Sequence, residues 1–133
     1  MGDVERAGSA FVIATRNRAP ELRKAVEALC GQTVLPAELC IVDSGDDAPA
    51  RADIEALCAA AGVELDYCHP APRGLTVQRN VGIDRTTGDP VFFIDDDTYM
   101  AADCHEQALA EFRRWGPKLG GVHATNLHPA RPP

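Results

Sequence analysis

Residues 91–98 read VFFIDDDT, an apolar run of strand length that leads directly into three consecutive aspartates. A continuous apolar run is typical of a strand that is buried on both faces of a parallel sheet. Two earlier runs have the same form: AFVIAT (10–15) leads into the polar loop 16–18, and LCIVD (39–43) ends on an aspartate. The three runs predict strands whose carboxyl ends carry the polar residues.

Helical patterns separate the predicted strands. Apolar residues at helical spacing predict helices over 20–31, 53–61, 75–85 and 102–115, with two more strands over 63–68 and 121–126. In the third helix we expect Leu75, Gln78 and Val81 to face inward. Strands that alternate with helices predict an α/β fold with an open, mostly parallel sheet and helices on both faces.

Composition limits the class of protein. The 133 residues are of one-domain size, and 45% of them are hydrophobic, which is enough for a core. The net charge of -7 argues against a nucleic-acid partner. No apolar stretch is long enough to be a transmembrane segment, and the amino terminus does not resemble a signal peptide. The five cysteines form no C-x-x-C pair, so we expect a reduced, cytoplasmic protein, either free or peripheral at the inner face of the membrane.

The polar strand ends are the candidate site. In an open α/β sheet the ligand lies beyond the carboxyl ends of the strands, so Thr15, Asp43 and the aspartates 95–97 should gather at one edge. Three adjacent carboxylates repel one another unless a cation neutralises them, and oxygen ligands suit Mg²⁺ or Mn²⁺. The simpler alternative is a solvated acidic turn.

Two further features bear on the ligand. Asp43 could accept a hydrogen bond from the ring N–H of a base, or it could only shape its own turn. Residues 31–70 hold eight acidic residues and one basic residue, so a diphosphate would need a bridging metal and a few arginines placed to meet it. The candidate arginines are Arg16, Arg18, Arg73 and Arg79. The glycine patterns of dinucleotide folds and P-loops do not occur, and the four histidines, expected at the surface, lack metal-ligand spacing.

Residues 10–126 resemble the nucleotide-sugar-binding half of a family 2 glycosyltransferase with the GT-A fold. FVIATRNR resembles the opening strand and loop of the family. LRKAVEALCGQTVLPAELCIVDSGDD resembles its first helix, Gln-Thr turn and second strand ending in Asp. RGLTVQRNVGIDRTTGDPVFFIDDDT resembles its Arg-Asn-x-Gly-Ile segment, Gly-Asp turn and DxD strand end. Several motifs in the expected order make the resemblance specific.

The resemblance implies a metal-dependent, inverting transfer of a sugar from a nucleoside-diphosphate donor, UDP- or dTDP-linked, to a hydroxyl of a glycan or lipid-linked glycan. It implies a nucleotide-binding role for Thr15, Arg16, Asn17, Arg18, Asp43, Arg79, Asn80, Asp95 and Asp96. Asp97 would be the main ligand of Mg²⁺ or Mn²⁺, with Asp95 assisting, and Asp96 would lie near the ribose.

The family pattern also includes a second half that supplies the acceptor site and a carboxylate general base. No Asp or Glu follows Glu111, so the general base is not found, and we expect residues 1–133 to be a single domain that holds the donor-binding part without the acceptor part. The alternatives are a non-catalytic nucleotide-sugar-binding module, a plain α/β domain with its site elsewhere, and a haloacid dehalogenase-type phosphatase. The phosphatase motif D-x-D-x-[TV] fits Asp95 and Asp97 but not Tyr99.

Overall fold

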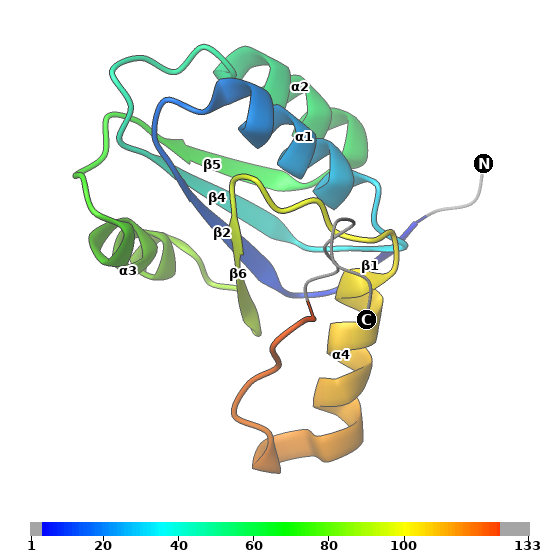
Figure 1. Cartoon of the computed structure of the whole chain (residues 1–133). Helices are drawn as coiled ribbons and strands as arrows, with labels where there is room; N and C mark the ends of the chain where they lie inside the picture. Colours follow the sequence, from blue (N-terminus) through cyan, green and yellow to red (C-terminus); the bar gives the residue numbers. More distant parts are fainter. Residues whose placement is uncertain (1–3, 126–133) are drawn as a thin grey trace, which may run out of the picture.

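A four-stranded parallel sheet forms the centre of the structure, a computed structural model that describes residues 4–125. The strands lie in the order β5, β4, β2, β6 (Figure 1). Their bounds are β2 Ala10–Thr15, β4 Glu38–Asp43, β5 Glu64–Cys68 and β6 Val91–Asp95. Beside the sheet, β1 (Glu5–Arg6) and β3 (Val34–Leu35) form a short parallel ribbon that the sequence did not predict.

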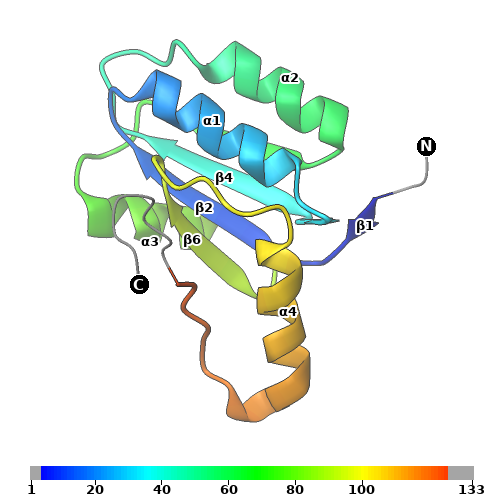
Figure 2. The same ribbon diagram turned by 45° about the vertical axis from the view of Figure 1, so that its right-hand side comes forward.

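Helices cover both faces of the sheet, which confirms the predicted fold class. α1 (Ala19–Cys30) and α2 (Arg51–Ala61) lie on one face, and α3 (Leu75–Arg85) lies on the other (Figure 2). α4 (Cys104–Trp115) packs near β3 and leads into a short 3-10 helix, Gly116–Lys118. Among the described residues, no helix combines the length and the hydropathy that a membrane span needs.

Alternating side chains of the central strands build the core on both faces. Phe11 and Ile13 of β2 pack with the apolar faces of α1 and α2, whereas Val12 points to the α3 side and packs with Cys40 and Val42 of β4. Burial on both faces explains why these strands read as continuous apolar runs in the sequence.

α3 approaches the sheet through small and polar residues. Its buried residues are Gln78 and Gly82, whereas Leu75 is half exposed, so the inward orientation predicted for Leu75 is wrong. A methyl group on Gly82 would overlap the side chain of Val12, which shows how closely the helix axis comes to β2. The close approach leaves no room for a large apolar side chain at this contact.

His105 fixes the first turn of α4 and is buried, contrary to the surface position predicted for it. Its Nδ1 lies 2.6 Å from the carbonyl oxygen of Val34, which can only accept, so Nδ1 carries the proton and donates. In the neutral ring Nε2 is then an acceptor, and it accepts from the Ser9 hydroxyl at 2.7 Å. Its ring meets those of Phe11 and Phe92 edge to face. Burial lowers the pKa of His105, more than the Val34 hydrogen bond raises it, so the neutral ring is favoured.

The predicted strand over 121–126 is wrong for residues 121–125, which form no strand. All five are exposed, and the segment begins with Gly121, which has no side chain to pack against the sheet. Position 126 lies outside the described residues.

Candidate functional site

The register of the parallel strands places the predicted site residues at one edge. Thr15 is paired with Asp43 across β2 and β4, and Ala14 is paired with Asp95 across β2 and β6. Asp96, the next residue, therefore lies beside Thr15, whose hydroxyl donates to the Asp96 Oδ2 at 2.9 Å. The structure thus brings together residues that lie 81 positions apart in the chain.

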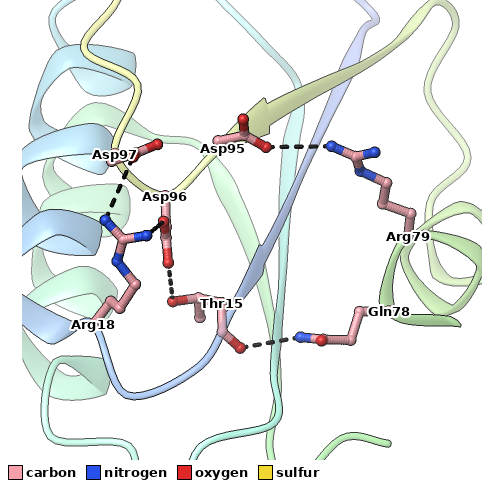
Figure 3. Close-up of polar contacts among 7 residues, drawn as sticks. All are labelled: Thr15, Arg18, Gln78, Arg79, Asp95, Asp96 and Asp97. Carbon is pink, nitrogen blue, oxygen red and sulfur yellow. Dashed lines mark hydrogen bonds and ion pairs between the residues drawn. The ribbon is translucent and has the colours of Figure 1, made fainter. Parts of the chain in front are cut away.

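Two arginines meet the three carboxylates, as Figure 3 shows. Arg18 contacts Asp96 Oδ1 and Asp97 Oδ2, each at 3.4 Å, and Arg79 contacts Asp95 Oδ1 at 3.2 Å. Asp95 points toward α3, whereas Asp96 and Asp97 point toward the loop before α1 (Figure 3). Guanidinium groups therefore lie against all three carboxylates in this structure. Exposed pairs of this length are weak, so an anionic or cationic ligand could replace them.

The three aspartates differ in burial. The side chain of Asp96 is 9% exposed, against 63% for Asp95 and 53% for Asp97. Burial raises the pKa of Asp96 above its usual range, although the Thr15 hydrogen bond and Arg18 act in the opposite direction. Asp96 is thus occupied in holding two strand ends together, and the two exposed carboxylates remain available to a ligand.

The donor set suits a hard cation that takes few ligands from the protein. Among residues 4–125, no group of three or more His, Cys, Asp or Glu side chains is placed to hold a metal. The carboxylates of Asp95 and Asp97 are nevertheless exposed oxygen ligands at the strand end. Mg²⁺ is commonly bound through one or two carboxylates plus substrate phosphates, and these residues fit that pattern.

A pocket of about 330 Å³ lies between the ends of β2, β4 and β5 and the starts of α1 and α2, and two of its lining residues, Thr15 and Arg18, contact Asp96 and Asp97. Its volume falls in the range of ordinary ligand sites. Polar and apolar residues share its lining: Thr15, Asn17, Arg18, Ala19, Pro20, Leu22, Asp43, Asp47, Pro49, Ala50 and Tyr67. The sequence predicted the polar residues of β2 and β4 but missed Tyr67 and the prolines.

Asp43 is buried and accepts two hydrogen bonds from the protein. Its Oδ1 accepts from the backbone N–H of Gly45 at 2.8 Å, which is the turn-shaping role that the sequence left open. Its Oδ2 accepts from the Tyr67 hydroxyl at 2.6 Å. Each carboxylate oxygen has two lone pairs, so a further bond to a base is compatible with both contacts.

Gln78 closes the other side of the strand ends and had no predicted role there. Its Nε2 donates to the carbonyl of Thr15 at 3.0 Å and to that of Val42 at 2.8 Å. It therefore fills the gap between β2 and β4 directly behind the pocket residues. The sequence signal was only a polar residue at a predicted inward position of a helix.

The other predicted residues are less closely associated. Asn17, at a φ of 54°, exchanges two hydrogen bonds with Asp46 and so joins the loops that follow β2 and β4. Arg16, Arg73 and Asn80 are exposed. In the described part of the chain, neither of these two arginines makes an ion pair, and Asn80 makes no side-chain hydrogen bond. The structure does not bring these three residues to the aspartates.

Known proteins share both the sequence pattern and the fold. The model of the family "Glycosyl transferase family 2" matches residues 10–126. EpsH of Bacillus subtilis (strain 168), named as a glycosyltransferase, is 31% identical over 106 residues, which are 80% of this chain and 30% of EpsH. The succinoglycan biosynthesis protein ExoM of Rhizobium meliloti (strain 1021) is 31% identical over 112 residues, or 80% of this chain and 36% of ExoM. The chain thus spans about a third of the length of these relatives.

Solved structures agree on the fold. S. aureus TarS 1-349 has a TM-score of 0.67 at 18% identity, over 80% of this chain and 32% of that one. The mannosyltransferase PcManGT from Pyrobaculum calidifontis, solved with GDP-Man and Mn²⁺, has a TM-score of 0.63 at 19% identity, over 85% of this chain and 33% of that one. With the acidic strand end and the pocket in place, and with the family model covering nearly the whole sequence, this chain belongs to glycosyl transferase family 2.

Proposed function

We propose that this chain binds the nucleoside-diphosphate sugar donor of an inverting, metal-dependent glycosyltransferase. The observation that carries the proposal is the pocket of about 330 Å³ at the strand ends, one lining residue of which, Arg18, contacts the exposed carboxylate of Asp97. The nucleoside would occupy the pocket, and the diphosphate would lie over Asp95 and Asp97. S. aureus TarS has been solved with UDP and with UDP-GlcNAc, and PcManGT with GDP-Man, which supports a nucleoside-diphosphate sugar as the donor; a UDP- or dTDP-linked donor is part of the proposal.

The residues of this edge would divide the work of binding. Asp43 would accept from the base, and Asp96 with Thr15 would form the wall next to the ribose. Arg18 and Arg79 would leave their weak contacts with the aspartates and turn toward the diphosphate oxygens, because guanidinium pairs well with phosphate. Both arginines can move without disturbing the core, since their side chains are 46% and 40% exposed.

A divalent cation would be held by Asp97, assisted by Asp95, together with the donor's phosphates. When bound, it would stabilise the negative charge that develops on the leaving diphosphate. Asp97 lies close enough to Arg18 for the same guanidinium to share that task. The sugar carbon would then be attacked by an acceptor hydroxyl from the face opposite the leaving group, which inverts the anomeric centre.

We assign donor binding to the described residues and assign no general base, and no site for a glycan or lipid-linked glycan acceptor, among them. The last acidic residue of α4, Glu111, accepts a hydrogen bond from Trp115, and α4 contacts the opposite end of the sheet through Ser9. A cytoplasmic location, free or peripheral at the membrane, is also part of the proposal and is supported by the five free cysteines.

Calorimetric titration tests the proposal directly. We expect UDP to bind to the 133-residue chain, more tightly with Mn²⁺ or Mg²⁺ than with EDTA. In a separate thermal melt, UDP with metal should raise the melting temperature, because a ligand of the native state stabilises it by mass action. Binding of neither UDP, dTDP nor GDP at millimolar concentration with metal would contradict the proposal.

The alternative of a non-catalytic nucleotide-sugar-binding module makes the same binding prediction and differs in turnover. Release of free sugar or transfer to an added acceptor by this chain would exclude the module. Family membership argues against the phosphatase alternative, and hydrolysis of a phosphate monoester that depends on Asp95 would be needed to revive it.

A further inference from the structure

Cys30 and Cys58 are two thiols that meet between α1 and α2, away from the proposed donor site. Cys30 is the last residue of α1 and is half-buried, whereas Cys58 belongs to α2 and is 1% exposed. The two side chains are hydrogen-bonded to each other, although β3 and β4 separate them in the chain. Donor binding as proposed above uses neither residue.

The packing of α1 against α2 holds the two thiols together. The helices lie side by side on one face of the sheet (Figure 2). Near their starts, Arg23 of α1 pairs with Asp53 of α2, with 2.8 Å between Nε and Oδ2. Cys30 lies about two turns after Arg23 on α1, and Cys58 lies more than one turn after Asp53 on α2. The ion pair and the thiol contact therefore join the helices at two levels.

The two thiols differ in reactivity. The hydrogen bond with Cys58 lowers the pKa of Cys30, although burial acts in the opposite direction. The same hydrogen bond, together with burial, raises the pKa of Cys58. Cys30 is therefore the thiol that ionises first and that solvent reaches, and these are the two properties of a nucleophilic cysteine. Cys58 is the neighbouring thiol that can complete a disulfide with it.

The other three cysteines lack this combination of a contact and a reactive partner. Cys40 is buried, and burial raises its pKa to about 12. Cys68 lies on β5 beside Val42, two positions along from Cys40, so these two side chains are diagonal neighbours rather than an opposed pair. Burial also raises the pKa of Cys104. Among the described cysteines, the pair between α1 and α2 is the one best suited to react with a thiol oxidant.

We infer that Cys30 and Cys58 form a thiol–disulfide site that reacts with low-molecular-weight disulfides such as oxidised glutathione. The Cys30 thiolate attacks one sulfur of the glutathione disulfide, and the released glutathione thiolate takes up the proton that Cys30 has lost. The Cys58 sulfur then attacks the Cys30 sulfur of the mixed disulfide, and its proton passes to the second glutathione. Two protein thiols are oxidised to one disulfide between α1 and α2, and one glutathione disulfide is reduced to two thiols. A reducing compartment keeps the pair as thiols, so the cross-link forms in response to oxidation.

Mass spectrometry of the full chain tests this inference. After incubation with an excess of oxidised glutathione, the free thiols are alkylated and the protein is digested with trypsin and a glutamate-specific protease. Cleavage after Glu38 and Glu64 places each cysteine in a peptide of its own, so every disulfide can be assigned. We expect a Cys30–Cys58 disulfide that dithiothreitol removes, with the other three cysteines alkylated. The cross-link should also raise the melting temperature by about 5–15 °C, because it restricts the unfolded chain.

Single variants separate the two steps of the reaction. In Cys58→Ala the reaction should stop at the mixed disulfide, with one glutathione bound to Cys30. In Cys30→Ala the Cys58 thiol should stay unmodified in the folded protein, because it is buried. Cys104→Ala is the matched control, since Cys104 is also half-buried but its pKa is raised; it should form the same disulfide as the wild type.

Three results with the wild-type chain would overturn the inference, whatever the variants do. These are a protein that keeps all five thiols, a glutathione adduct on Cys30 that Cys58 does not displace, and a disulfide between other cysteines. None of the three bears on donor binding, because neither Cys30 nor Cys58 lines the pocket.

Discussion

Asp97 is the carboxylate at the strand end that is best placed to change partners. It is more than half exposed, and its side chain makes one ion pair among the described residues, with Arg18 at 3.4 Å. An exposed pair of this kind contributes at most about 1 kcal/mol to stability. The side chain can therefore leave Arg18 for a metal at a cost of no more than about 1 kcal/mol, whereas Asp96 is buried against Thr15.

We predict that Asp97→Asn removes the part of the UDP-induced rise in melting temperature that depends on Mn²⁺. The amide keeps the size of the side chain but loses the charge that a hard cation requires. The free energy of unfolding without ligand should change by less than about 1 kcal/mol, because only an exposed pair is lost. Asp84→Asn, at an exposed position of α3, is the control. A metal response that survives in Asp97→Asn would show that another residue holds the metal.

Gln78 carries a different kind of role, since it is buried and binds only the protein. Replacement by leucine would remove two hydrogen bonds, one to the carbonyl of Thr15, which also accepts from the N–H of Ser44 at 3.1 Å, and one to the carbonyl of Val42. We predict that Gln78→Leu lowers the free energy of unfolding by about 1–3 kcal/mol, because each buried hydrogen bond that is lost costs about 0.5–1.5 kcal/mol. Urea denaturation measures this change, and Gln107→Leu on the exposed face of α4 should cost much less. Equal losses in the two variants would mean that the bridge between the strands contributes nothing.

At the scale of elements, the contact of α3 with β2 is the tightest constraint behind the site. α3 presents Gly82 to Val12 and Gln78 to the ends of β2 and β4, so the glycine sets the depth at which the glutamine reaches the strands. Any side chain at position 82 would lift the helix from the sheet.

We therefore predict that Gly82→Ala destabilises the protein by about 1–3 kcal/mol, the usual cost of forcing an extra methyl group into a packed contact. Alanine otherwise favours a helix over glycine, so a loss of stability must come from the overlap. Thermal melts of the two variants and the wild type measure this loss. Gly120→Ala, where an added methyl group meets nothing within 4 Å, should be nearly neutral. A stabilised Gly82→Ala variant would show that α3 can move away freely.

The same contact explains which elements could be predicted from the sequence. The strands were predictable because residues such as Val12 and Ile13 alternate between two buried faces and leave no polar position in the run. The orientation of α3 was not predictable, because the residues that face the sheet are a glycine and a glutamine. Leu75 is apolar and was therefore expected to face the sheet, but it is half exposed. Tyr67 was missed since its partner Asp43 is known only when β5 is placed beside β4.

The carboxylates show the same limit at the site. Strand polarity was enough to predict that the ends of β2, β4 and β6 meet. It could not predict that Arg18 and Arg79 would turn toward the aspartates, because side-chain direction depends on neighbours far away in the sequence. The sequence thus predicted which strand ends form the site and which residue types they carry, and the structure showed which arginine pairs with which aspartate.

At the scale of the whole molecule, His105 joins the parts that lie far from the site. It connects α4 to the start of β2 through Ser9 and to β3 through Val34, and it packs against aromatic rings of the main sheet. Because burial lowers its pKa below the ordinary 6.5, the folded protein binds a proton here less readily than the unfolded chain does.

The sign of the pH dependence follows. Above pH 6.5 the ring is neutral in both states and the stability is complete, whereas below 6.5 the unfolded chain takes up the proton first and the folded state loses stability. The loss from one proton is at most about 1.4 kcal/mol per pH unit. We predict that the melting temperature of His105→Asn falls less between pH 7.5 and pH 5 than that of the wild type, because asparagine keeps a donor for Val34 but cannot titrate. His123→Asn, at an exposed position, is the control and should show the same fall as the wild type. Parallel curves for His105→Asn and the wild type would mean that α4 tolerates a charged ring, and that the acid sensitivity of the protein arises from its carboxylates alone.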